Sequence, residues 1–270
     1  MKGAVKIILI TLLVLTGTAF SYAQEKLWAR LHNDTSNRYK EGRYAEAAEV
    51  GREALKVAEK TFGAAHPNTG SSLNNLAAIY REQGKYDQAE PLNIRALTIH
   101  EKSLGPDHPL VAKSLNNLAL LYKLQGRYAE AEPLYLRALA IRESAFGKAH
   151  PEVSTSLNNL AALYHTQGKY SEAEPLYIQA LAVRKKALGN KHPAVAISLN
   201  NLAFLYLVQG EYETAEPLFN QALEIFNLSL GPYHPHAVKA LENTAACYKK
   251  LGREDEAKKL EDRVKEIKSR

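Results

Sequence analysis

The chain has 270 residues, of which 46% are hydrophobic and 24% are charged, and its formal net charge is +6. This balance excludes an intrinsically disordered chain, because it supplies enough apolar surface for a packed core. The excess of basic residues fits an acidic peptide or an anionic lipid surface as partner, whereas no Lys/Arg run or RNA-reading motif supports binding to nucleic acid. Cys247 is the single cysteine, so stability has to come from packing rather than from an internal disulfide.

Residues 1–23 have the layout of a secretory signal peptide. Lys2 and Lys6 precede an apolar run over residues 7–15, and small residues then lead to an A-x-A-like cleavage site that ends at Ala23. The apolar run is shorter than the ~20 residues that a membrane-spanning helix needs, so we expect no stable membrane span after the leader is removed. An uncleaved N-terminal anchor is the alternative. The sequence predicts an exported protein, either periplasmic or secreted.

From about residue 30 onward, the sequence repeats itself every 42 residues. The string Ser-Leu-Asn-Asn-Leu-Ala begins at residues 72, 114, 156 and 198, and a degenerate copy begins at Ala240. Gly-x-Tyr, Ala-Glu-Pro-Leu and Gly-x-x-His-Pro recur with the same step. Motifs that share one period define a repeat architecture. We divide residues 24–270 into six repeats, at about residues 30–71, 72–113, 114–155, 156–197, 198–239 and 240–270.

Each repeat is predicted to form two helices, as the third repeat illustrates. Residues 109–125 carry apolar side chains at helical spacing, and Gly126 follows at a position where a positive φ is wanted. A second helix is expected over residues 128–146, with Pro133 in or near its first turn. Alanines at fixed positions mark where helices approach closely. One such pair cannot bury its apolar face alone, so the repeats are expected to stack.

These motifs carry a family resemblance. A first helix with Leu, Leu-Ala and Tyr, followed by Gly-x-Tyr and Ala, resembles the tetratricopeptide repeat (TPR). The 42-residue length, Asn-Asn, Ala-Glu-Pro-Leu and Gly-x-x-His-Pro are similar to the kinesin light chain-like subtype, over about residues 30–270. The resemblance implies an all-α fold, a right-handed α-α superhelical solenoid of about six helix pairs whose first helices line a concave groove. It implies a non-catalytic adaptor or scaffold, but not motor cargo, because fold does not fix function.

Both ends depart from the pattern, as terminal caps of a repeat array do. In the first repeat, Asp34, Thr35 and Arg38 occupy positions that are Leu, Ala and Tyr in later copies. Residues 254–270 lack the repeated proline and are dense in charge. We therefore expect solvated end faces.

No residue pattern points to catalysis, and none points to a metal or a cofactor. One histidine precedes a proline in each of five repeats: His66, His108, His150, His192 and His234. Zinc needs three or four ligands within about 2.3 Å of one point, whereas stacked helices lie ~8–10 Å apart, so these histidines are expected to pack or cap beside proline. Cys247 aligns with Ile or Leu in other repeats, which predicts a core position. Phosphate loops, G-x-S-x-G and H-E-x-x-H are missing from the sequence.

The repeated Asn-Asn pair is the main candidate binding feature. Asparagine competes for backbone hydrogen bonds, so its repeated use inside a helix requires a reason. One interpretation is structural, with amides bonded across adjacent first helices. The other, implied by the resemblance, is that the amides hold the backbone of an extended peptide, with the second Asn of each pair the better match. The candidates are Asn74, Asn75, Asn116, Asn117, Asn158, Asn159, Asn200, Asn201 and Asn243.

Other positions predicted for the same face differ between repeats. Arg81, Lys113 and Lys123 make part of it basic, while Phe204 and Leu207 make one repeat apolar. These residues predict a protein or peptide ligand with acidic residues and an apolar anchor. The alternative is a structural scaffold or spacer that self-associates and has no groove ligand, which the near-identical inner repeats favour.

Overall fold

The computed structural model describes residues 22–269. The predicted signal peptide, residues 1–23, lies outside the described residues apart from its last two positions. Within the described part, no helix is long and apolar enough to cross a membrane.

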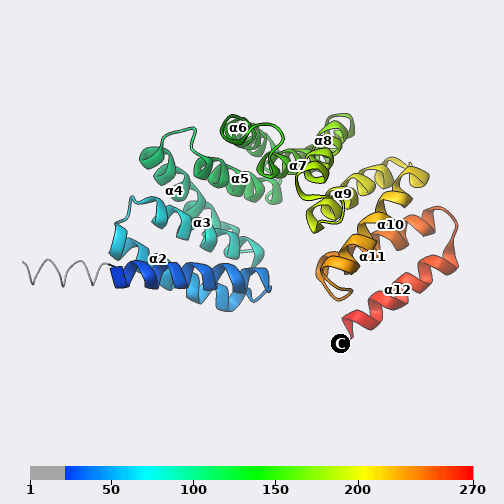
Figure 1. Ribbon diagram of the computed structural model, residues 1–270, viewed down its shortest axis with the longest axis horizontal. Helices are drawn as coiled ribbons and strands as arrows, with labels where there is room; N and C mark the ends of the chain where they lie inside the picture. Colours follow the sequence, from blue (N-terminus) through cyan, green and yellow to red (C-terminus); the bar gives the residue numbers. More distant parts are fainter. Residues whose placement is uncertain (1–21, 270) are drawn as a thin grey trace, which may run out of the picture. The chain divides into compact units, whose positions relative to one another are not determined.

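The described residues form helices joined by short connections, and they contain no strand. A helix over residues 22–40 comes first. It is followed by α2 (Tyr44–Phe62), α3 (Pro67–Glu82), α4 (Tyr86–Leu104), α5 (Pro109–Leu124), α6 (Tyr128–Phe146), α7 (Pro151–Thr166), α8 (Tyr170–Leu188), α9 (Pro193–Gln209), α10 (Tyr212–Ser229), α11 (Pro235–Lys250) and α12 (Glu254–Lys268) (Figure 1). The chain is an all-α TPR solenoid of about six helix pairs.

The chain divides into two compact halves, which we call the N-terminal half (residues up to Leu134) and the C-terminal half (from Tyr135). Inside each half, the two helices of a repeat pack together, the second helix packs on the next first helix, and first helices of successive repeats also touch. Examples are α3 with α4, α4 with α5, and α3 with α5 in the N-terminal half, and α7 with α8, α8 with α9, and α7 with α9 in the C-terminal half. Within each half, successive helices therefore pack side by side without interruption.

Local sequence explains where the first helices begin. The histidine before each proline is the N-cap, and its Nδ1 accepts the backbone N–H two residues on at 3.1–3.2 Å, with proline in the first turn where no N–H is needed. This holds for His66, His108, His150, His192 and His234. The prediction that these histidines cap beside proline is confirmed.

The prediction for the proline of Ala-Glu-Pro-Leu is wrong in detail. Pro133 is the sixth residue of α6, one turn later than expected, and Pro91, Pro175 and Pro217 lie at the same place in their helices. All four prolines are exposed. The carbonyl that loses its helical partner therefore lies on the outer side of the second helix, where water can bond to it.

The core repeats with the sequence. Alanines on both helices are fully buried and allow close approach: Ala77, Ala119, Ala161, Ala203, Ala89, Ala131, Ala173, Ala215, Ala96, Ala138, Ala180 and Ala222. Tyr135, Tyr177 and Phe219 occupy one repeat position in the second helices and are also buried. Cys247 is buried in a cluster with Ala203, Ala215 and Phe219, as its alignment with Leu and Ile predicts.

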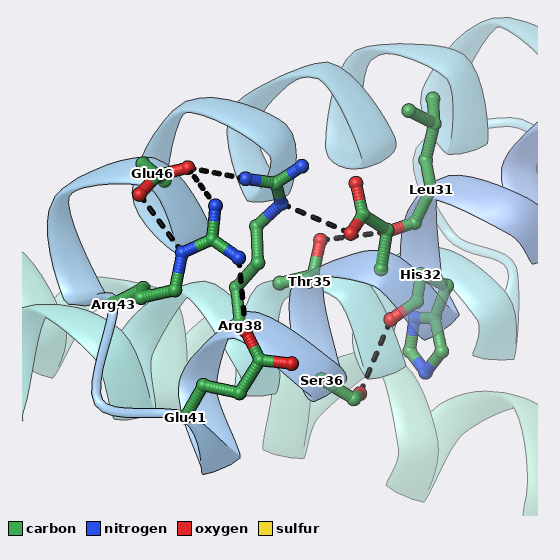
Figure 2. A network of polar contacts seen from close by, with 9 residues as sticks. Leu31, His32, Thr35, Ser36, Arg38, Glu41, Arg43 and Glu46 are labelled. Atoms are coloured by element: carbon green, nitrogen blue, oxygen red, sulfur yellow. Dashed lines mark hydrogen bonds and ion pairs between the residues drawn. The ribbon is translucent and has the colours of Figure 1, made fainter.

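The first repeat replaces apolar contacts by a charged network. Arg38 pairs with Asp34 at 2.9 Å and also with Glu46, and Arg43 bridges Glu46 and Glu41 (Figure 2). The helix over residues 22–40 is thus tied to α2 by ion pairs at positions where later repeats place Leu and Tyr. This substitution suits a solvated end of the array.

The repeated glutamate of Ala-Glu-Pro-Leu joins one repeat to the next. Glu90 pairs with Arg127 at 2.9 Å, and Arg127 lies over the ring of Tyr122 with its guanidinium carbon 3.8 Å from the ring centroid. Glu216 pairs with Arg253 at 2.6 Å in the same way. These acids are therefore structural links rather than catalytic candidates.

The link at Glu174 differs, because Glu211 stands where other repeats have Arg or Lys. The Tyr206 hydroxyl donates to Glu174 at 2.7 Å, and burial together with this carboxylate raises the pKa of Tyr206 to about 12. Within the part of the chain that the structure describes, Glu174 and Glu211 form no ion pair, unlike Glu90 and Glu216. We therefore expect the contact between the repeats that contain Glu174 and Glu211 to be the less stable repeat interface of the C-terminal half.

Glu211→Arg is expected to raise the midpoint of thermal unfolding by about 1–2 °C, because it supplies the missing partner for Glu174. Circular dichroism during heating measures the change. Glu224→Arg, which alters the net charge equally at an exposed position inside α10, the helix that Glu211 precedes, is the control and should leave the midpoint unchanged. Equal shifts in both variants would show that net charge, rather than the Glu174 link, is responsible.

Candidate ligand-binding face

The asparagines line the side of the array formed by the first helices, which we call the first-helix face. In the C-terminal half, the amide nitrogen of Asn201 donates to Asn158 Oδ1 at 3.0 Å, and that of Asn243 donates to Asn200 Oδ1 at 3.0 Å. The second Asn of one repeat thus bonds to the first Asn of the repeat before it. The structural interpretation of the pairs is confirmed at these two steps.

The N-terminal half varies the same scheme. Asn75 donates to His32 Nε2 at 3.3 Å, and His32 occupies the position of the first Asn in its repeat. Asn74 donates instead to Ser114 Oγ at 2.7 Å. Burial, followed by the charge of Lys113, lowers the pKa of His32, which keeps the ring neutral so that Nε2 can accept.

The second Asn is partly exposed in every pair, whereas the exposure of the first Asn varies. Asn75, Asn117, Asn159 and Asn201 are all partly exposed, whereas Asn74 and Asn158 are buried. Asn116 and Asn200 are partly exposed as well. The second Asn of each pair is therefore consistently within reach of a ligand, and in the first repeat the exposed Asn33 holds the same place, which the 42-residue register could have revealed.

A pocket of about 270 Å³ lies on this face in the N-terminal half. Its cationic lining residues are Lys40, Arg81 and Lys113, and its amides are Asn74, Asn75 and Asn117. Arg81 is buried and is held by Glu82 at 2.6 Å and by the Tyr39 hydroxyl at 3.0 Å, so its charge is already partly balanced. Lys113 is exposed, which leaves it better placed than Arg81 to meet an acidic ligand.

Lys123 lies outside this pocket, near the end of α5. Its side chain is partly buried, and burial alone lowers its pKa. Arg81 and Lys249, which hold the same position in other repeats, pair with Glu82 and Glu261, whereas Lys123 forms no ion pair within the described residues. An ammonium group in this state gains from a carboxylate brought by a ligand.

A second pocket, of about 290 Å³, lies in the C-terminal half and is lined largely by rings. His165 and Phe204 come from first helices, with ring centroids 5.5 Å apart. Phe226 stacks on His236 at 5.6 Å. The remaining lining residues are Tyr177, Ile197, Asn200, Asn201, Lys239 and Asn243. The pocket therefore combines an apolar wall with amides and one cation.

Sequence reasoning found part of this second pocket. Phe204 lines it as predicted for an apolar position, but Leu207 packs against the Cys247 cluster. Tyr177 and Phe226 were missed because they come from second helices. The sequence does contain one signal for Phe226: it is an aromatic residue at a repeat position that is held elsewhere by His100, Arg142 and Arg184.

The comparisons with known proteins agree with this architecture. The family model for the tetratricopeptide repeat matches residues 36–93, 70–144, 117–186, 152–227 and 194–270. No curated protein sequence matches the chain.

Several solved structures are similar. A kinesin light chain-type protein of Podosopora anserina with nearly identical TPR-like repeats is 29% identical over 76% of this chain and 97% of its own, with a TM-score of 0.62. BtubC of P. vanneervenii is 28% identical over 85% of this chain and 91% of its own, with a TM-score of 0.67. A Rap protein in complex with competence and sporulation factor is 15% identical over 90% of this chain and 75% of its own, with a TM-score of 0.65, which shows the fold alone. The chain belongs to the tetratricopeptide repeat family, and its repeats are similar to those of kinesin light chain-like members.

Proposed function

We propose that this protein is an exported, non-catalytic adaptor that holds an extended segment of a partner protein on its first-helix face. The observation that carries the proposal is that each half has two partly exposed second asparagines beside a pocket on its first-helix face. TPR proteins generally serve as scaffolds, and the family and its kinesin light chain-like neighbours support a role in protein interaction.

The amides suit a peptide backbone because each offers both a donor and an acceptor at the spacing of the repeat. In Asn201 and Asn243 the amide nitrogen is bonded to the preceding repeat. That bond fixes the orientation of the side chain and points the remaining oxygen in a defined direction. A ligand then meets a preorganised row, which reduces the entropy lost on binding.

The charge and pocket pattern indicates the ligand class. Lys113 and the unpaired Lys123 favour acidic side chains, and the ring-lined pocket around Phe204 favours an apolar anchor. We therefore propose a partner segment that carries both features. Export rests on the signal-type layout of residues 1–23.

Affinity capture from the native exported fraction tests this function. The bait is protein purified after export, compared with a variant carrying Asn117→Ala, Asn159→Ala and Asn201→Ala. Loss of backbone contacts at three repeats is expected to lower partner recovery by about tenfold or more, since each lost hydrogen bond contributes about 1 kcal/mol. Circular dichroism checks that the variant remains helical.

Asn37→Ala with Asn190→Ala is the control, because both side chains are exposed and line neither pocket. Equal recovery by the triple variant and this control would move the interface away from the first-helix face. Recovery of the protein itself and nothing else would favour the self-associating scaffold. That alternative has one observation in its favour, which is the exposure of Ile94, Leu136 and Ile178 at one repeat position on the second helices.

A further inference from the structure

Four large apolar side chains of the C-terminal half are exposed at the connections between repeats. They are Phe146, Leu188, Leu228 and Tyr233, with exposed fractions from 36% to 72%. Each lies at the end of a second helix or in the connection to the next first helix. We call the connections α6–α7, α8–α9 and α10–α11, with the last turn of the helix before each, the loop edge.

Contacts inside the C-terminal half place these connections on the same side. Arg184, near the end of α8, donates to Ser154 at the start of α7 at 3.1 Å and to Ser198 near the start of α9 at 2.9 Å. Phe226, near the end of α10, stacks on His236 at the start of α11 and shares a core cluster with Leu199 of α9. The starts of α7, α9 and α11 therefore lie at one edge, with the second-helix ends beside them.

The same edge is basic. Lys148, Lys186 and Lys191 are exposed, Lys185 is partly exposed, and none of the four forms an ion pair within the described residues. Among the acids beside them, Glu152 is paired with Arg142 at 3.3 Å, which leaves Glu143. Positive charge therefore predominates at the α6–α7 and α8–α9 connections, which carry Phe146 and Leu188, whereas the α10–α11 connection has no Lys, Arg, Asp or Glu.

The N-terminal half does not share this character. Phe62 and Leu104 hold the positions of Phe146 and Leu188, but both are only partly exposed. Its second connection carries Asp107 at the position of Lys191, although Lys102 is exposed at the position of Lys186. Exposed apolar side chains combined with unpaired lysines are thus particular to the C-terminal half and do not follow from the repeat itself.

We propose that the loop edge docks on the surface of an anionic lipid bilayer. Aromatic and aliphatic side chains enter the interfacial region of a bilayer, and lysines beside them meet lipid phosphates. A lipid surface is favoured over a protein partner because the exposed groups are on projecting connections, and none of them lines the three pockets described in the structure. A fluid surface accepts such projections without a complementary shape. The first-helix face remains available to a peptide ligand.

Flotation with lipid vesicles tests the proposal. Protein purified after export is mixed with vesicles of phosphatidylcholine alone or with about 30% phosphatidylglycerol, which supplies the anionic surface. The expected result is flotation with the anionic vesicles, which decreases as salt is added. Lys186→Gln and Lys191→Gln should each lower the apparent affinity about fivefold, and Leu228→Ser with Tyr233→Ser should lower it further.

The matched control is Ile178→Ser with Val208→Ser, which removes two exposed apolar side chains of the same half away from the loop edge. It should float like the unchanged protein, and so should the triple asparagine variant of the first-helix face. A residual leader would contribute equally to all variants. Absence of flotation, equal flotation with neutral vesicles, or equal loss in the control would overturn the proposal. Capture of an acidic protein by the loop edge without vesicle binding would assign it to a protein partner instead.

Discussion

Replacing Phe219 with alanine is expected to lower the free energy of unfolding by about 3–5 kcal/mol. Phe219 is fully buried and packs with Ala203, Ala215 and Cys247 between α9, α10 and α11. The buried neighbours Ala203 and Ala215 have no side-chain torsion to adjust, so they cannot move in to fill the space. The cost should therefore include a cavity as well as the lost transfer free energy.

Urea unfolding followed by circular dichroism measures the loss. Phe204→Ala is the control, because the same change is made on a ring that is 38% exposed in the ring-lined pocket, and it should cost less than about 1 kcal/mol. A repeat array can unfold in parts, so the slope with denaturant should be compared as well as the midpoint. Similar losses of unfolding free energy in the two variants would mean that the second-helix position of Phe219 does not belong to the core.

The repeat architecture could be predicted almost completely from the sequence, because its signals are local. Helix starts follow from His-Pro, and helix ends follow from glycines such as Gly126, whose φ is +76°. The observed α6 has the predicted bounds, residues 128–146. The proline position was misjudged because local preference places proline in the first turn, whereas in the assembled array an exposed second-turn position is also tolerated.

The candidate site could be predicted only in part. The asparagine positions follow from periodicity, but bonds such as Asn201 to Asn158 depend on how neighbouring first helices are aligned. The ring-lined pocket combines residues of five helices, α7 to α11, with α8 and α10 contributing one ring each. No pattern within a single helix predicts such a combination. The partners of Arg81 could not be predicted either: Glu82 balances its charge, and the Tyr39 hydroxyl from the preceding repeat accepts a hydrogen bond from it.

The N-terminal half contains a glycine whose role appears only in three dimensions. Gly70 lies inside α3, where the other inner repeats carry Ala112, Ser154 and Ala196. A Cβ atom at residue 70 would lie 2.6 Å from Nε2 of His100, closer than real Cβ contacts allow. Glycine is therefore required here by close approach, even though a helix interior disfavours it.

His100 cannot easily move away. Its ring is fully buried, with Nε2 3.1 Å from the Pro67 carbonyl and Nδ1 2.8 Å from Ser114 Oγ. In the neutral ring, Nε2–H donates to the carbonyl and Nδ1 accepts from the serine hydroxyl. Burial lowers the pKa of His100 and so favours this neutral form. Any shift of the ring would break two hydrogen bonds in a fully buried site.

Gly70→Ala is therefore expected to destabilise the protein by up to about 2 kcal/mol, since the steric cost of as much as about 3 kcal/mol at a 2.6 Å contact exceeds the gain of ~1 kcal/mol from alanine in a helix. In a His100→Ala background the clash is absent, and the same substitution should instead stabilise by about 0.5–1 kcal/mol. Urea unfolding of the four proteins gives the coupling energy, which should be about 2 kcal/mol. If Gly70→Ala destabilised the protein in both backgrounds, this explanation would be contradicted, and the backbone rather than His100 would be the reason for glycine at residue 70. If the effect of Gly70→Ala on stability reversed in the His100→Ala background, the buried ring of His100 would be the reason that this repeat has glycine where the others have Ala or Ser.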